Sequence, residues 1–362
     1  MYNVIPYHEK YDAEIRALLR ITVSSDISLA LEREPNYSYG THIQCEQPEV
    51  YIVIIENKVK AVCNLGFRRV WINGQIESVR YLCDLRIHPD QQKTSLFKEV
   101  GKFLTNLMKD DPFPAQTVVF SDNRPMIKLA KKSIRNNGVL PVYHFIDHIE
   151  NFIVPFDKKA AKKEFPTIRK AQLSDIGRLQ AFYDAFGKSK PYHPYYDFSS
   201  LSAPYFRDCD ITDFLIAERD GAIVGCLGVW DLKNIKQTRI VSYSFRFRLL
   251  RPFYNLFARI ANRVLLPPAG SVLGYLNIHA VAVLDGDCAV FSDLLDAVMR
   301  YYVAGSEMNS VLCSLVKSDP LLPVLTVKRN AFRTQGNYYL CNRSTELPSG
   351  LEGGGYLEAA RI

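Results

Sequence analysis

Residues 50–66 read VYIVIIENKVKAVCNLG, and residues 213–228 read DFLIAERDGAIVGCLG. Each stretch has an apolar run, a short polar turn and a second apolar run, a pattern that predicts a β-hairpin. Asp220-Gly221 is typical of a tight hairpin turn, and Glu56 matches Glu218 at an offset of 162 residues. Two such hairpins far apart in one chain indicate an internal repeat.

The repeat continues on both sides of these hairpins. Asp12 precedes a helical pattern in the first copy, as Asp175 does in the second. Tyr81-Leu82 matches Tyr275-Leu276 at an offset of 194, so the second copy carries an insertion of about 32 residues. The order of elements predicts an α+β protein in which each copy is a mixed, mostly antiparallel sheet flanked by helices.

These matches divide the chain into segments. We expect a first domain at residues 1–150, a basic linker at 151–165, and a second domain at 166–343 with the insertion at about 232–270. Residues 344–362, which include three consecutive glycines, are expected to form a flexible tail. The length of 362 residues agrees with about two domains of ordinary size.

The composition excludes several classes of protein. Hydrophobic residues make up 48% and charged residues 23%, which excludes a disordered or fibrous chain. The eight cysteines stand singly, so we expect neither a zinc ribbon nor a disulfide scaffold, no bound metal, and a reducing, cytoplasmic location. Prolines and glycines interrupt the uncharged run at 264–284, so we do not interpret it as a transmembrane helix.

Residues 84–97, DLRIHPDQQKTSLF, read as a strand end, a polar loop and the start of an amphipathic helix. With the order of elements, this stretch resembles the fourth strand and pyrophosphate loop of the GNAT superfamily of acyl-CoA-dependent N-acyltransferases, in a tandem form. The resemblance covers about residues 1–150 and 165–343. Lys93, Ser95 and Phe97 stand where that family usually has glycines, and Ala130 aligns with its frequent catalytic Tyr.

The resemblance implies that the first copy binds acetyl-CoA or another acyl-CoA. The implied contacts are Leu85, Arg86, Ile87 and His88 along the strand, Gln91, Gln92, Lys93, Thr94, Ser95 and Leu96 at the helix start, and Asn123 after the fifth strand. A helix N-terminus binds phosphate through its free N–H groups, and Lys93 adds a positive charge. The alternative is that Thr94 or Ser95 only caps the helix.

Asp84 is the candidate general base for an acceptor amine, because strand alternation places it with Arg86 and His88 on one face. The alternative is that Asp84 and Arg86 form ion pairs across the sheet. In the second copy Asp285 and Asp287 stand in the matching loop, where negative charges disfavour a pyrophosphate.

The insertion carries the basicity of the chain. Residues 232–284 contain eight Lys and Arg and no Asp or Glu, and an apolar stripe predicts an amphipathic helix from Phe253 to Val264. We expect Arg246, Arg248 and Arg251 to steer an anionic substrate or cofactor toward the cleft. The alternatives are a helix docked on the sheet, a contact with an anionic membrane, and, with less support, nucleic acid, for which no binding module is present.

The sequence therefore favours an N-acyltransferase that moves an acyl group, by expectation acetyl, from acyl-CoA to the amine of a small-molecule acceptor. Two alternatives stay open. One is a catalytically silent acyl-CoA sensor, which the missing glycines and Tyr permit. The other is a membrane-surface enzyme like the N-acyl amino acid synthases. The acceptor and the oligomeric state do not follow from the sequence.

Overall fold

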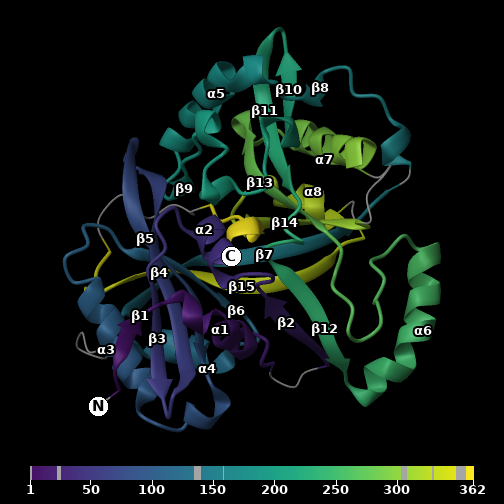
Figure 1. Ribbon diagram of the computed structural model, residues 1–362. Helices are drawn as coiled ribbons and strands as arrows, with labels where there is room; N and C mark the ends of the chain where they lie inside the picture. Colours follow the sequence, from purple (N-terminus) through teal and green to yellow (C-terminus); the bar gives the residue numbers. More distant parts are fainter. Residues whose placement is uncertain are drawn as a thin grey trace.

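The computed structural model describes residues 2–22, 26–133, 140–157, 159–302, 308–327, 330–347 and 356–362. Within these ranges thirteen strands form one large sheet, and two more form a separate ribbon (Figure 1). Helices cover both faces of the large sheet, so the predicted fold class is confirmed. None of the described helices is long and apolar enough to cross a bilayer.

The large sheet contains the same strand order twice, read inward from its two ends. The first half contributes β1 (Val4–Pro6), β3 (Val50–Ile55), β4 (Lys58–Ile72), β5 (Gln75–Ile87) and β6 (Ala115–Phe120). The second half contributes β8 (Ile168–Lys170), β10 (Phe214–Arg219), β11 (Ala222–Trp230), β13 (Leu276–Val283) and β14 (Ser310–Val316). The short β9 (His193–Pro194) adds to β4. Most neighbours are antiparallel, whereas β5–β6 and β13–β14 are parallel pairs.

The two halves exchange a strand at the centre of the sheet. β7 (Val142–Pro155) follows the first half but pairs with β14, and β15 (Phe332–Asn342) follows the second half but pairs with β6. β7 and β15 also pair with each other, so one continuous sheet joins the halves. Residues 151–155, expected as the start of a linker, are therefore the end of β7.

Both hairpins turn where the sequence predicts. Glu56 and Asn57 have φ values of 50° and 60°, and Asp220 and Gly221 have φ values of 50° and 78°. Two successive positive φ angles belong to the turn that matches the right-handed twist of paired strands. The structural correspondence runs from Glu56 to Asp220, an offset of 164, so the sequence match of Glu56 with Glu218 is two residues out of register.

Amphipathic helices pack on the two faces of each half. In the first half α3 (Leu96–Leu107) and α4 (Arg124–Ser133) cover one face, while α1 (Asp12–Leu19) and α2 (Tyr37–Gln44) cover the other. In the second half α7 (Cys288–Tyr302) and α8 (Leu322–Val327) cover one face and α5 (Ile176–Lys188) the other. This symmetry follows from strands that are apolar on both faces.

The last seven residues do not form the tail that the sequence predicts. Tyr356, Leu357, Glu358 and Arg361 are buried, and the short 3-10 turn Ala359–Arg361 contacts β13 and β14 (Figure 1). The glycine-rich residues 348–355 of the expected tail lie outside the described residues.

The insertion at about 232–270 lies between β11 and β13. It forms β12 (Gln237–Tyr243), which pairs with β2 (Ile27–Glu32) of the first half, and then α6 (Phe245–Ile260). The helix begins eight residues before the predicted Phe253 and continues through Pro252. Ser244 precedes the helix: its N–H and hydroxyl are both hydrogen-bonded to Asp26 at 3.0 Å, and its carbonyl accepts from the Arg248 N–H at 2.9 Å.

Candidate functional site

The strands β5 and β6 separate after a short parallel contact. Their pairing runs from Tyr81 opposite Gln116 to Leu82 opposite Thr117, where the Thr117 hydroxyl donates to the Leu82 carbonyl at 2.9 Å. β5 continues to Ile87 paired only with β4 in the described residues. Its edge toward β6 therefore offers backbone N–H and C=O groups to a ligand that carries amides.

A β-bulge at Asp84 marks the start of this open edge. Cys83 pairs with Asn64 and Arg86 with Val62, so Asp84 and Leu85 together stand opposite one residue of β4. Asp84 has a φ of 50°, which breaks the alternation that the sequence predicts through this strand. A bulge re-aims a side chain locally, and such bulges are common beside active sites.

Asp84 is held by a buried arginine. Arg33, which is 2% exposed, donates from Nη2 to Asp84 Oδ1 at 3.0 Å. The arginine stem passes beside Gly40 of α2, where a Cβ would come within 2.5 Å of Arg33 Cδ. The alternative of an ion pair for Asp84 is thus observed, but its partner is Arg33 on the loop after β2 rather than a neighbour across the sheet.

Three buried polar atoms around this pair have no hydrogen-bond partner in the described part of the chain. They are Arg33 Nε, Asp84 Oδ2 and the hydroxyl of Tyr37 on α2. The charge of Asp84 contributes to the raised pKa of Tyr37, after burial as the main cause, so the two side chains are close neighbours. Buried polar groups in native proteins are almost always satisfied, so this group is a candidate site for ligand or water.

A lysine from the insertion completes the cluster. Burial and the positive charge of Arg33 lower the pKa of Lys236 to about 7, while Asp84 and Cys83 act in the opposite direction. The ammonium also donates to the backbone oxygen of Ile362. The same Asp84 charge opposes the burial that lowers the pKa of Arg86. Asp84 therefore lies among three cationic side chains.

The loop expected to hold a pyrophosphate lies just beyond the open edge. It forms a 3-10 turn, Pro89–Gln91, and leads into α3, with residues 92–95 exposed. Thr94 donates from its hydroxyl to the Gln91 carbonyl at 2.8 Å and accepts from Leu96 N–H at 3.2 Å. The capping alternative is therefore seen at Thr94, and phosphate binding stays a prediction.

Other predicted cofactor residues have local partners. His88 contacts Asp90 at 2.7 Å, and Asp90 also pairs with Lys60. Asn123 caps α4 by accepting from Met126 N–H at 3.2 Å. Lys93 forms no ion pair among the residues described, so its charge is available to an anion.

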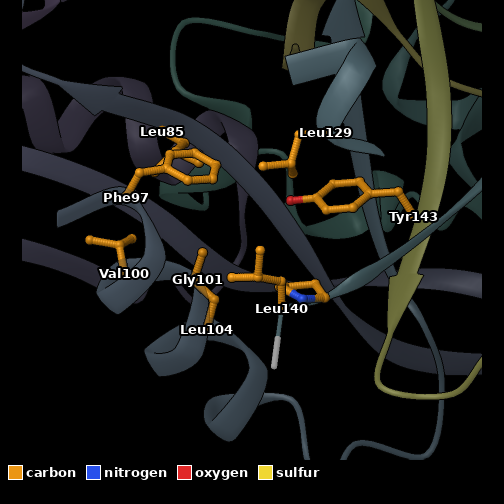
Figure 2. Close-up of a pocket in the computed structure, with 9 residues that line it drawn as sticks. Leu85, Phe97, Val100, Gly101, Leu104, Leu129, Leu140 and Tyr143 are labelled. Carbon is orange, nitrogen blue, oxygen red and sulfur yellow. The ribbon is translucent and has the colours of Figure 1, made fainter. Parts of the chain in front are cut away.

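A small apolar pocket adjoins the open edge between α3 and α4. Figure 2 shows Leu85 and Phe97 on one side, Leu129 and Tyr143 on the other, and Val100, Gly101, Leu104 and Leu140 along the helix α3 side. Its free volume of about 10 Å³ has room for roughly one water molecule. The pocket brings the predicted Leu85 together with both helices, and no long ligand fits it as it stands.

The second half repeats the geometry but closes it. β13 and β14 pair only at Leu276–Val311 and Asn277–Leu312, and Ala280 has a φ of 48° within a shift of register against β11. Here the chain itself takes the freed donors. Ala280 N–H donates to Glu358 Oε1 at 2.8 Å, and Val281 N–H donates to the Tyr356 hydroxyl at 3.2 Å.

Buried partners hold that closing segment in place. Glu358 also accepts from Tyr196 and from Arg361, at 2.7 and 3.1 Å. Arg361 donates in turn to the carbonyl oxygens of Ile43 and Tyr205 at 2.6 and 3.0 Å. His279 lies beside Tyr196, hydrogen-bonded at 2.9 Å, and burial lowers its pKa well below the ordinary value, as expected of a satisfied core histidine.

The predicted steering arginines lie on α6. Among the described residues, no contact joins them to the bulge at Asp84. Arg248 lies 5.6 Å from the ring of Phe245, and Arg251 lies 5.9 Å from the ring of Tyr243. Figure 1 places α6 at the outer edge of the molecule, on the opposite side from β5. A role for Arg246, Arg248 and Arg251 in steering stays a prediction.

Sequence reasoning did not single out Arg33, Tyr37 or Glu358 and counted Lys236 only as part of the basic insertion. Arg33 lies between Glu32 and Glu34, a charged run typical of a solvated surface. Glu358 follows a glycine run that is typical of a mobile end. Only the distant contacts of the fold identify these residues, so no local signal in the sequence could have found them.

Comparisons with known proteins agree with this architecture. No protein-family model matches the sequence, and no curated protein matches it at a significant level. Among solved structures, an N-myristoyltransferase of Saccharomyces cerevisiae with bound myristoyl-CoA and inhibitors is similar, with a TM-score of 0.61 at 10% identity, over 96% of this chain and 81% of that chain. A GCN5-related N-acetyltransferase from Anabaena variabilis is similar with a TM-score of 0.50 at 12% identity, over 94% of this chain and 72% of that chain. The chain thus has the two-lobed GNAT fold of N-acyltransferases over nearly its whole length.

Proposed function

We propose that this protein is an acyl-CoA-dependent N-acyltransferase whose first half binds the acyl-CoA and whose acceptor is a small molecule with an amine. One observation carries the proposal: β5 keeps an open edge beside the start of α3, while the matching edge of β13 is closed by Glu358 and Tyr356. The fold shared with N-acyltransferases supports the same class of reaction.

The cofactor would lie along the open edge. Leu85, Arg86, Ile87 and His88 would offer backbone groups to the pantetheine amides. The pyrophosphate would lie against Gln91, Gln92, Lys93, Thr94, Ser95 and Leu96, where the charge of Lys93 and the helix dipole favour an anion. Asn123 would contribute at the start of α4. Asp285 and Asp287 place negative charge at the matching loop of the second half, which further favours the first.

The unpartnered atoms at the bulge would receive the acceptor. Asp84 Oδ2 would accept a hydrogen bond from the acceptor amine, and Arg33 would hold the carboxylate in place. The amine nitrogen attacks the thioester carbonyl, the C–N bond forms, the C–S bond breaks, and the sulfur leaves as the CoA thiolate. Lys236, with a pKa of about 7, is matched to take the proton from the amine and return it to the thiolate.

The acyl group would be short. The apolar pocket behind Leu85 has space for only about one water molecule, so a long chain would require its lining side chains to move. Acetyl-CoA is therefore the proposed donor. The isolated cysteines support a reducing, cytoplasmic location as part of the same proposal.

A thiol-release assay tests the activity. The full-length protein is incubated with acetyl-CoA or a longer acyl-CoA and a panel of small amines and amino acids, and free CoA thiol is measured. We expect amine-dependent release that is fastest with acetyl-CoA. Tight binding of acetyl-CoA by calorimetry with no release for any amine would instead identify an acyl-CoA sensor.

Two matched pairs of variants separate the sites. Lys93→Glu puts a negative charge beside the phosphates and should weaken acetyl-CoA binding, whereas Lys109→Glu, just beyond the other end of α3, should not. Tyr37→Phe removes a buried hydroxyl that has no hydrogen-bond partner among the described residues, so it should raise KM for the amine without lowering stability. Tyr183→Phe is the control, because it removes another buried hydroxyl that lacks a partner in the described part of the chain, and it should leave KM unchanged.

A further inference from the structure

Helix α6 presents an uncovered apolar face. Phe245, Leu249, Phe253, Leu256 and Ile260 recur at helical spacing along one stripe and are all exposed, with Phe253 at 74%, Leu256 at 61% and Ile260 at 82%. Leu250 and Phe257 widen the stripe and are also exposed. The alternative of a helix docked on the sheet predicts that the sheet covers this stripe, and these side chains are exposed instead. Contiguous exposed apolar surface of this size marks an interaction site.

The opposite face of α6 fixes this orientation. Tyr254 donates to the Val264 carbonyl at 3.0 Å, and Asn255 both donates to and accepts from Leu266 at 2.9 Å. Ala258 is fully buried, and Asn330 donates to the Ala261 carbonyl at 3.0 Å. The polar groups of the inner face are thus used by the return loop, so the helix cannot turn its apolar stripe inward without losing these bonds.

The charge around the stripe selects its partner. Arg246, Arg248, Arg259 and Arg263 are exposed, and none of them forms an ion pair within the described ranges. No Asp or Glu occurs between residues 232 and 284. Two copies of this helix face to face would bring unpaired arginines together, which disfavours self-association. An anionic surface satisfies both the charge and the apolar stripe.

The shape of the region agrees with a flat partner. The β2–β12 ribbon carries α6 to the outer edge of the molecule, where the helix stands apart from the large sheet (Figure 1). A projecting helix with an apolar stripe and flanking arginines is the form of an interfacial helix, which lies in the plane of a bilayer with its apolar side among the acyl chains.

We propose that α6 binds the surface of membranes that contain anionic lipid, with Phe253, Leu256 and Ile260 inserted and Arg248 and Arg259 on the headgroups. The proposal is independent of the acyl-transfer site, because it uses only residues of α6, none of which is placed in that site. It gives the protein a docking surface in addition to its proposed reaction.

Vesicle binding by the full-length protein tests the proposal. Co-sedimentation compares vesicles of phosphatidylcholine that contain about 30% phosphatidylserine with vesicles of pure phosphatidylcholine. We expect binding to the anionic vesicles, at least about tenfold weaker binding to the neutral ones, and a decrease as salt rises. Arg248→Gln with Arg259→Gln should weaken binding about 25-fold, at roughly fivefold for each charge.

A triple variant and its control distinguish binding through the apolar stripe from non-specific hydrophobic binding. Phe253→Ser, Leu256→Ser and Ile260→Ser together should reduce binding by more than about a hundredfold, since three large side chains lose their apolar transfer. Leu173→Ser with Val327→Ser removes two exposed apolar residues elsewhere, both 77% exposed, and should change nothing. In a Phe253→Trp variant the new indole should shift to blue emission on anionic vesicles, because Trp71 and Trp230 are already buried.

Three results would overturn the proposal. They are no binding to anionic vesicles, binding that the triple variant retains, and a dimer in sedimentation velocity that the triple variant converts to a monomer. The last result would assign the stripe to a second copy of the chain. None of these outcomes bears on thiol release, so the proposed activity is tested separately.

Discussion

The buried ion pair at the bulge determines the largest effect expected of a single substitution. Arg33 Nη2 and Asp84 Oδ1 lie 3.0 Å apart, with side chains 2% and 10% exposed. At an effective dielectric constant of about 20 their attraction is about 5 kcal/mol, much of which offsets the loss of hydration. Replacing Asp84 with Asn leaves the guanidinium buried without a counter-charge. We expect this change to lower the free energy of unfolding by about 3–5 kcal/mol.

Urea denaturation of the wild type, Asp84→Asn and the double variant Arg33→Gln/Asp84→Asn measures this effect. Asn tolerates the positive φ of position 84, so the backbone is not a second cause of instability. The double variant replaces two charges with two amides and should recover most of the lost stability. Both variants should lack thiol release, because neither has the carboxylate of Asp84. The double variant should therefore recover stability without recovering activity.

This reasoning is wrong if Asp84→Asn costs less than about 1 kcal/mol, or if the double variant is less stable than the single one. It is also wrong for function if the stable double variant keeps wild-type thiol release, because the carboxylate would then have no part in the reaction.

Three further predictions concern Lys236, the closed edge of the second half and the apolar pocket. Because the pKa of Lys236 falls from 10.5 to about 7 on folding, this lysine should contribute stability that rises as pH increases from about 7 to 10.5, measured in urea denaturation as the difference between the wild type and Lys236→Met at several pH values. Thiol release should also increase as pH rises through about 7 in the wild type, since the neutral amine is the base. Glu358→Gln should lower stability by about 3–5 kcal/mol, because Arg361 is only 1% exposed, yet leave acetyl-CoA affinity by calorimetry unchanged. Leu129→Ala should enlarge the apolar pocket and raise kcat/KM for butanoyl-CoA relative to acetyl-CoA, and an unchanged ratio would place the acyl group elsewhere.

The fold was predictable because its signals are local. The hairpin at Asp220-Gly221 needs residues that accept positive φ, and the spacing of Leu96, Val100 and Leu104 fixes the buried face of α3. The exchange of β7 and β15 was not predictable. Each strand has the same apolar pattern whether it pairs with its own half or with the other, so the sequence does not distinguish the partners.

The candidate site was predictable only in part. Asp84 and the loop at 91–96 follow from the motif and its position after a strand. The ion pair with Arg33 and the low pKa of Lys236 arise from contacts between segments more than 50 residues apart, and the bulge interrupts an alternation that the residue pattern predicts as regular. The closed edge of the second half was not predicted for a similar reason. The glycines before Tyr356 are typical of a mobile end, whereas the residues that follow them are buried against the sheet.

The most direct test of the central claim is a crystal structure of the full-length protein soaked with acetyl-CoA. We expect the pantetheine along the open edge of β5, the pyrophosphate against residues 92–95 at the start of α3, and the thioester beside Asp84. Ligand density along β13 beside Asp285 and Asp287, with the edge of β5 left empty, would contradict the account.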